Sequence, residues 1–190
     1  WSESYYRRHH DDTSSDYDPA FPDGYWDPIN SGKKMGRPDN IVALANVNNY
    51  LWLFGQESNE IHYDTGQLDE QLFARYEGAI LNFGCCAKHS VAVINNSVFW
   101  LSTDSRGTLG VFTNDGLAPR RISTRGVEQI IQEMDAYSDA IGFCYSQSGH
   151  TFYVLQFPTA DRTFVYDLVT DAWHERTYLE RLRAQGRTVV

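Results

Sequence analysis

Positively charged residues are scarce in this sequence relative to acidic ones. Its 190 residues include 16 Lys and Arg against 25 Asp and Glu, which gives a formal net charge of −9 at pH 7. A protein that binds nucleic acid through phosphate neutralisation requires the opposite balance. The composition therefore argues against a DNA-binding domain, although it is compatible with a surface past which DNA slides without sticking.

Cysteine is also rare, and the three that occur, Cys85, Cys86 and Cys144, have no metal-ligand spacing. Adjacent cysteines rarely bridge each other because the geometry of such a disulfide is strained. We therefore expect reduced thiols, no disulfide framework and assembly in a cytoplasm.

The sequence also lacks long apolar runs, an initiator Met and a charged leader followed by an apolar region. These absences predict no membrane segment and indicate a piece of a longer polypeptide. Hydrophobic side chains nevertheless make up 42% of the chain and aromatic ones 14%, enough to bury a core and to exclude a wholly disordered protein.

Recognisable catalytic and metal-binding signatures are missing as well. The run His9–Asp12 offers potential ligands, but adjacent side chains of an extended segment point to opposite sides, and no second cluster has matching spacing. Asp16, Asp18 and Asp23 lack the Gly and Glu positions of a calcium loop. His150 follows a turn glycine and is expected to cap a hairpin. We predict no catalytic residue, no metal, no cofactor and no enzymatic activity.

Residues 1–36 are predicted to form an irregular acidic segment, because Pro and Gly recur among Asp, Ser and Tyr without strand or helix periodicity. The segment is nevertheless too rich in large rings for a solvated linker. We expect an ordered loop that lies on a neighbour, with interface candidates at Tyr5, Tyr6, Tyr17, Phe21, Tyr25 and Trp26.

Residues 37–190 carry three similar units of β-strands and are predicted to form a partial β-propeller. The strands are expected at 42–47, 50–54 and 60–64 in the first unit, at 90–94, 97–101 and 109–113 in the second, and at 140–145, 151–157 and 163–167 in the third. The dipeptides Asn48-Asn49, Asn95-Asn96 and Ser148-Gly149 suit hairpin turns with positive φ. The units recur at steps of about 47 and about 53 residues, in the range of propeller blades.

One amphipathic helix is predicted between the second and third units. Apolar residues with helical spacing occur at Val127, Ile130, Ile131 and Met134. We expect this helix on the rim of the blades, where Glu128 and Glu133 are further interface candidates.

The remaining connections complete the predicted fold class. A short helix is expected within residues 67–76, through Leu68, Leu72, Phe73 and Tyr76. Residues 187–190 look like the first strand of a fourth unit. The sequence therefore predicts a mainly β protein of about three antiparallel propeller-like blades plus a partial one, with one rim helix and an irregular N-terminal segment.

These residues carry a resemblance to a known family. The matching stretches are Pro38–Val42, Leu51–Gly55, Glu60–Tyr63, Ser97–Leu101, Asp104–Gly107, Arg121–Thr124 with the helix that follows, Gly149–Asp167 and Trp173–Arg176. From about residue 36 to its C-terminus, the chain resembles the tail-hub family of short-tailed bacteriophages, whose members are called packaged-DNA stabilisation proteins.

The resemblance implies a β-propeller-like structural protein of the virion tail that assembles in the cytoplasm of the bacterial host. It implies a ring of copies of the chain, expected to be six. The ring would lie between the portal and adaptor proteins on one side and the needle and tailspike or fibre proteins on the other. Such a ring would retain packaged DNA, let it pass without sequence-specific binding, and release it at ejection. The family offers no catalytic residues to carry over.

Two alternatives from other classes stay open at this point. A kelch-like interaction module is suggested by Tyr166-Asp167 followed by Trp173, although the paired glycines of that repeat are missing. A propeller glycosidase would need two carboxylates at one mouth, and strand-end acids such as Asp64 and Asp167 exist.

Overall fold

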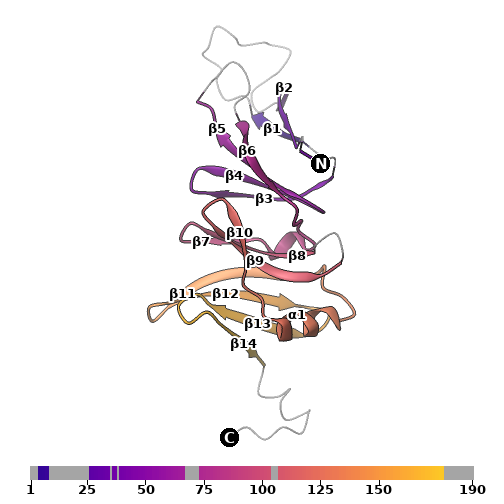
Figure 1. Cartoon of the computed structure of the whole chain (residues 1–190), viewed down its shortest axis with the longest axis vertical. Helices are drawn as coiled ribbons and strands as arrows, with labels where there is room; N and C mark the ends of the chain where they lie inside the picture. The colour runs from indigo at the N-terminus through magenta and orange to yellow at the C-terminus, as the bar shows by residue number, and fades with distance from the viewer. Residues whose placement is uncertain are drawn as a thin grey trace, which may run out of the picture.

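Three four-stranded antiparallel sheets form most of the chain in its computed structural model, which describes residues 4–8, 26–34, 36–37, 39–66, 73–103 and 107–177. The sheets are stacked along the long axis of the molecule (Figure 1). Within each sheet the strands follow chain order, as in the blades of a propeller. The predicted fold class is confirmed, and the three sheets do not close into a ring.

Each sheet is an up-and-down meander of short strands. The first contains β3 (Ile41–Val47), β4 (Tyr50–Gly55), β5 (Asn59–Asp64) and β6 (Phe73–Leu81); the second contains β7 (Ala92–Ile94), β8 (Ser97–Thr103), β9 (Leu109–Asp115) and β10 (Ala118–Arg121); the third contains β11 (Ile141–Gln147), β12 (His150–Phe157), β13 (Arg162–Asp167) and β14 (Ala172–Arg176). A 3-10 turn, η1 (Lys88–Ser90), precedes β7.

The first two strands of every sheet are joined by a tight two-residue turn with left-handed backbone. Asn48 and Asn49 have φ values of 53° and 64°, and Asn95 and Asn96 have values of 47° and 66°. Asn tolerates this conformation better than other residues with a Cβ, and such turns match the twist of the flanking strands. The predicted hairpin positions are therefore confirmed.

Alternation along the strands builds two separate cores, because neighbouring side chains point to opposite faces. Trp100 of β8 points to the first sheet, where its ring centroid lies 5.3 Å from that of Phe54. Phe99, its neighbour, points to the third sheet and stacks on Tyr153 with centroids 4.9 Å apart. The middle sheet is thus buried on both faces.

The second and third sheets approach each other closely beside η1. A Cβ at Gly142 of β11 would lie 2.2 Å from the carbonyl oxygen of Ser90, so only glycine fits there. The Tyr153 hydroxyl donates a hydrogen bond to the same oxygen at 2.8 Å. This contact fixes the spacing of the two sheets.

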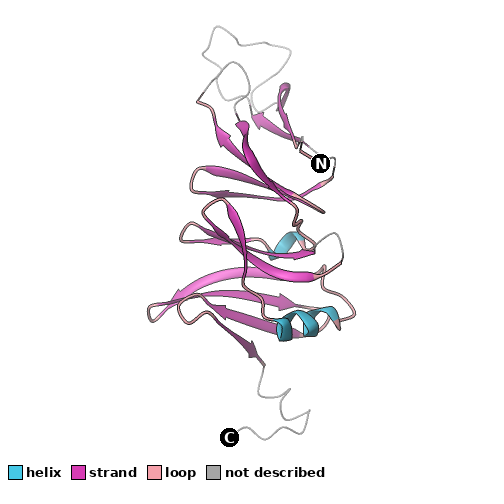
Figure 2. Ribbon diagram, in the orientation of Figure 1, coloured by secondary structure: helices cyan, strands magenta, loops and turns pink. Residues whose placement is uncertain are grey.

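Helix α1 (Arg125–Gln132) packs on the same core and confirms the predicted rim helix (Figure 2). The Thr124 side chain caps its N-terminus by accepting a hydrogen bond from the Val127 N–H at 3.4 Å. Val127 and Ile131, two of the predicted apolar positions, are buried in the core between the second and third sheets.

Three expectations about secondary structure differ from the structure. Residues 73–76 belong to strand β6 rather than to a helix, because β6 pairs with β5. The segment expected to be irregular contains two strands, β1 (Ser4–Arg8) and β2 (Trp26–Lys33), which pair antiparallel. Each unit gains a fourth strand that the alternation pattern does not reveal. The fourth-unit strand expected at 187–190 lies outside the described residues.

Candidate interaction surfaces

The predicted interface positions of the N-terminal segment fall partly on strands. Tyr5 and Tyr6 belong to β1, which pairs with β2, the strand that begins at Trp26. Tyr17, Phe21 and Tyr25 lie outside the described residues. Their roles in an interface stay predictions.

The two glutamates predicted on the rim helix have different surroundings. Glu128 is largely buried and accepts hydrogen bonds from Arg121 Nε at 2.7 Å and from Ser123 Oγ at 2.5 Å, so it joins the helix to the chain before it. Glu133 is exposed and accepts a hydrogen bond from Gln129 Nε2 at 3.0 Å. Of the two, Glu133 is the more available to a partner.

A buried polar cluster joins the segment after β2 to the first sheet. The Lys34 ammonium, which is inaccessible to solvent, donates hydrogen bonds to Asp39 and, at 2.6 Å, to Ser58 Oγ. The second carboxylate oxygen of Asp39 accepts the backbone N–H groups of Glu57 and Ser58 at 2.8 and 3.0 Å. A buried ion pair with its remaining hydrogen bonds satisfied holds its elements in one arrangement.

Glu60 extends this cluster along β5. Its carboxylate accepts the Gly36 N–H at 2.6 Å and lies 3.2 Å from His62 Nε2. Burial alone would raise the pKa of Glu60, but the hydrogen bonds with His62 and Gly36 and the charge of Lys34 lower it below its usual 4.5. The side chain is therefore ionised and anchors the backbone at Gly36 to the first sheet. Sequence periodicity cannot reveal this cluster, because its members come from a loop and two strand ends.

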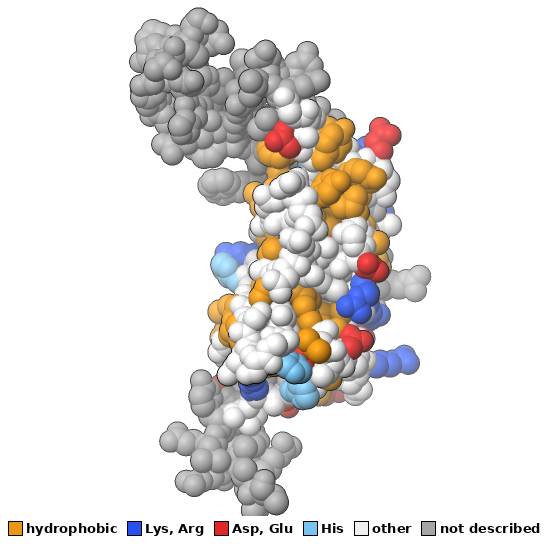
Figure 3. Space-filling view, turned by 90° about the vertical axis from the view of Figure 1, so that its left-hand side faces the viewer, with side chains coloured by type: hydrophobic (Ala, Val, Ile, Leu, Met, Phe, Trp, Pro, Cys, Tyr) orange, Lys and Arg blue, Asp and Glu red, His pale blue; other side chains and the backbone are white. Residues whose placement is uncertain are grey.

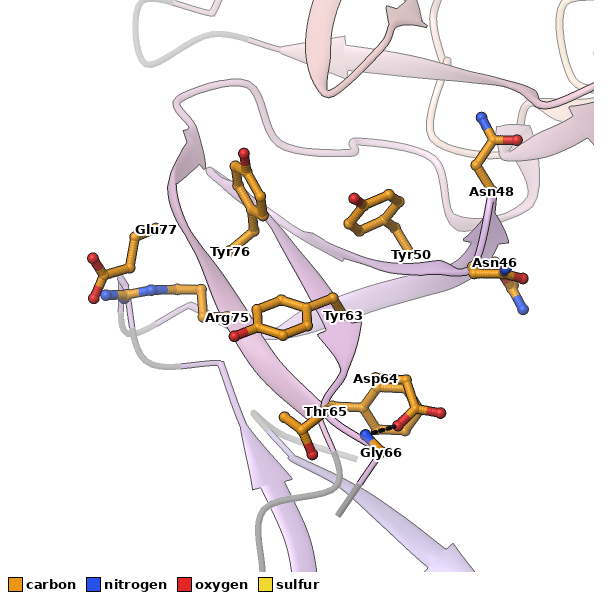
Figure 4. Close-up of a pocket in the computed structure, with 12 residues that line it drawn as sticks. Asn46, Asn48, Tyr50, Tyr63, Asp64, Thr65, Gly66, Arg75, Tyr76 and Glu77 are labelled. Carbon is orange, nitrogen blue, oxygen red and sulfur yellow. Dashed lines mark hydrogen bonds between the residues drawn. The ribbon is translucent and has the colours of Figure 1, made fainter.

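A shallow groove of 1210 Å³ lies at the turn end of the first sheet (Figure 4). Tyr50 and Tyr76 meet edge to face in it, with ring centroids 6.3 Å apart. Tyr63 and Tyr76 are about 40% exposed. Hydrophobic side chains gather on the upper part of the described surface (Figure 3). Exposed tyrosines offer large rigid contacts with a polar end, which favours protein interfaces.

The outward face of the third sheet, which points away from the second sheet, carries a ladder of rings. Tyr145 stacks on Phe152 at 5.0 Å, and Phe152 lies beside His150 at 5.9 Å. The Arg176 guanidinium covers the Tyr145 and Phe152 rings at 5.5 and 5.9 Å. Phe143 on the same face is 48% exposed. Aromatic rings with an Arg are the usual core of a binding surface.

His150 is part of this ladder rather than only a hairpin cap. Its Nδ1 lies 2.7 Å from Asp167 Oδ2, which also accepts the Thr170 hydroxyl at 2.9 Å. Burial would raise the pKa of Asp167, but hydrogen bonds from the Val169 N–H, Thr170 and His150 lower it. Asp167 therefore orients His150 against Phe152. The pair is distant in sequence and becomes visible only through the register of β12 and β13.

A comparison with protein-family models matches residues 2–178 to the family described as "Bacteriophage P22 Gp10, beta-propeller". The chain belongs to this family. It is therefore a structural phage protein of the group that stabilises packaged DNA, as the resemblance implies. A comparison with curated proteins finds no match.

The three cysteines are thiols of low reactivity. Burial raises the pKa of Cys85 to about 11 and that of Cys86 and Cys144 to about 12. A thiol is a nucleophile only as the thiolate, so these groups are unreactive near neutral pH. All three are free thiols that pack as small side chains in or against the two cores.

The carboxylates of the glycosidase alternative are not brought together. Asp64 ends a strand of the first sheet and Asp167 ends a strand of the third, with the second sheet between them (Figure 1). Among the described residues no group of three or more His, Cys, Asp or Glu could hold a metal ion. Within the same ranges, no helix is long and apolar enough to cross a membrane. The runs at 9–12 and 16–23 lie outside them.

The aromatic pair that suggests a kelch repeat has a packing role. Tyr166 and Trp173 lie with ring centroids 5.2 Å apart, and Trp173 Nε1 donates a hydrogen bond to the Ile122 carbonyl at 2.8 Å. Trp173 thus joins the last strand of the third sheet to the chain that leads into α1. The pair stabilises the stacking of the sheets.

Proposed function

We propose that this protein is a tail-hub component, which assembles into a ring and connects the portal and adaptor proteins to distal tail parts. The observation that carries the proposal is the family match over residues 2–178. A rigid stack of sheets suits this role. Both faces of the middle sheet are packed, and contacts between aromatic side chains hold the first and third sheets against it. A rigid stack of sheets holds its outer surfaces at a fixed distance and orientation to each other.

Contacts between copies or with other virion proteins are assigned to surfaces that the stacked sheets leave open. The tyrosine groove of the first sheet and the exposed side of α1 near Glu133 are the main candidates, together with the N-terminal segment that contains Tyr5, Tyr6 and Trp26. The needle and the tailspikes or fibres would occupy other parts of the same ring.

In this proposal, DNA is retained by the closed ring and by electrostatic repulsion of its phosphates, and not by binding to the protein. The net charge of −9 supports a surface that does not adhere to phosphates. Strands β3, β7 and β11 contribute no such charge, because they contain no Asp, Glu, Lys or Arg. Acidic groups that face DNA would therefore come from other elements.

Electron microscopy of the protein mixed with the portal and adaptor proteins of its phage tests the proposal. The expected result is a ring of copies, with six as the predicted number, attached to the adaptor. A companion measurement replaces Tyr63 and Tyr76 with Ser and should weaken the ring without unfolding the monomer, with exposed Val169→Ser as the matched control. A protein that stays monomeric in the presence of both partners would contradict the hub function.

A further inference from the structure

The tyrosine groove of the first sheet holds three Tyr side chains from three strands. Tyr50 of β4 pairs with Tyr63 of β5, so their side chains point to the same face of the sheet. Tyr76 of β6 reaches that face, because its ring meets the ring of Tyr50. Figure 4 shows the three rings in the middle of the groove. Three separate strands thus bring one kind of side chain to one place.

Two of these rings stand at right angles. The planes of Tyr50 and Tyr76 meet at 89°, with ring centroids 6.3 Å apart. Tyr63 and Tyr76 are 40% and 42% exposed, so part of their ring surface is open to solvent. Proteins bind organic cations against such rings, because the negative faces of the rings attract a positive charge.

The charged groups of the groove also favour a cation. Among its described lining residues, Asp64 and Glu77 contribute two carboxylates and Arg75 one guanidinium, which leaves a net charge of −1. Arg75 and Glu77 are two residues apart on β6, where their charges offset each other. One oxygen of Asp64 accepts the Gly66 N–H at 2.8 Å, and the other has no partner among the described residues. The second oxygen is therefore available to a cation.

The remaining lining residues argue against other ligands. Those that the structure describes include no Val, Leu, Ile or Met, so an apolar ligand would find no aliphatic contacts. A phosphate or a nucleic acid would meet a net negative charge. An organic cation fits both the rings and the charge.

The repeated fold does not require a ring at the centre of this groove. Tyr50 is the first residue after its hairpin turn. The corresponding residues of the second and third sheets are Ser97 and His150. The ring of Tyr50 is therefore a feature of the groove and not of the sheet architecture.

We propose that the tyrosine groove binds the guanidinium of an Arg side chain that a neighbouring virion protein presents on an exposed loop. The Tyr50 and Tyr76 rings flank the guanidinium, and the second oxygen of Asp64 accepts one of its N–H groups. Arg suits this site better than Lys, because its planar group both stacks on rings and binds carboxylates. The choice of a virion protein as partner rests on the proposed function, whereas the Arg site does not.

Two short peptides test the site on the complete chain. They share one sequence except at the central residue, which is Arg in one and citrulline, its neutral isostere, in the other. NMR titration follows the ring signals of Tyr63 and Tyr76. The Arg peptide should bind roughly fivefold more tightly than the citrulline peptide, and added salt should reduce the difference. Equal binding of the two peptides, or binding of neither, would overturn the inference.

Substitutions then locate the binding. Tyr76→Leu and Asp64→Asn should each weaken binding of the Arg peptide by roughly threefold. Phe143→Leu, which alters a 48% exposed ring on the third sheet, is the matched control and should leave binding unchanged. Unfolding in denaturant verifies that each variant folds, and Tyr63→Leu takes the place of a variant that does not. Arg binding that survives both groove substitutions unchanged would also overturn the inference.

The result is separable from that of the hub experiment. Peptide binding by a chain that forms no ring of copies would support the Arg site and contradict the hub function, and a ring of copies without peptide binding would do the reverse. Light scattering tests for a different source of the Arg. A dimer of the chain that the Arg peptide dissociates and the citrulline peptide does not would place the Arg on a second copy, which would overturn the assignment to another protein.

Discussion

At the residue scale, the side chains that most need a partner are charged groups buried away from water. Lys34 and Asp39 form a buried ion pair whose partners also bind Ser58. Removing one partner of such a pair leaves the other charge without compensation, which is more harmful than losing both. Stability of the first sheet therefore depends on residues in a loop that precedes it.

Asp39→Asn is expected to lower the free energy of unfolding by about 3 to 5 kcal/mol, because it removes the carboxylate that is paired with the buried Lys34 ammonium. Chemical denaturation measures the loss. Asp115→Asn, at an exposed position, provides the control and should change stability by less than about 0.5 kcal/mol. Equal effects of the two substitutions would show that the pair does not anchor the segment.

Glu60 predicts a pH dependence whose direction follows from its lowered pKa. A carboxylate whose pKa is lower in the folded state stabilises the protein above its unfolded value and loses that contribution as pH falls through the folded value. Stability should therefore decline below about pH 4.5, the usual value for Glu. Glu60→Gln should be less stable at neutral pH but show a flatter decline in acid. If the stability of Glu60→Gln declined in acid as steeply as that of the original protein, the pH dependence would come from other carboxylates, such as Asp167.

At the element scale, the hairpin turns set the register on which the packing faces depend. A shift by one residue would exchange the side chains of β8 between the two cores, so that Trp100 and Phe99 would swap faces. The left-handed dipeptide Asn95-Asn96 fixes this register. Turn chemistry and core packing therefore specify the same arrangement.

Asn95→Val should destabilise the protein by about 1 to 2 kcal/mol, because a β-branched residue is strained at a φ of 47°. Asn95→Gly removes that strain and should leave stability within about 0.5 kcal/mol of the original. Thermal unfolding of the two variants measures the difference. Similar melting temperatures would mean that the turn does not constrain the register.

The same scale shows what a sequence can reveal about this fold. The central strands carry turn dipeptides and apolar residues, so they can be placed from the sequence. Strands β10 and β14 are largely exposed edges without apolar alternation, and β10 even contains Pro119, which edge strands tolerate. In β6, irregular pairing with β5 and a positive φ at Gly78 break the period of two, and the remaining pattern mimics a helix.

The candidate surfaces cannot be placed from the sequence for a related reason. The aromatic character of Phe143, Tyr145 and Phe152 is visible in the sequence, but whether these rings face a core or an open side depends on which sheets surround them. The contact between His150 and Asp167 likewise requires the strand register. Composition therefore predicts packing rings, and only the stacking order shows which of them are free.

At the scale of the whole molecule, the stacked sheets form a nearly one-dimensional series. Among the described residues, the core around Trp52 and Trp100 and the core around Phe99 and Tyr153 share no residue, and the middle sheet lies between them. In such arrays stability is approximately the sum of the units and of the interfaces between neighbours. Damage to one interface should therefore remain local.

Trp100→Ala tests this locality. Loss of the large side chain from the first core should destabilise the protein by about 3 to 5 kcal/mol. Hydrogen exchange should then rise in β4, β5 and β8, while the amides of β12 and β13 keep most of their protection. Leu155→Ala, in the other core, is the matched control and should reverse this distribution. A uniform rise over all three sheets in both variants would show that the three sheets unfold as one cooperative unit rather than sheet by sheet.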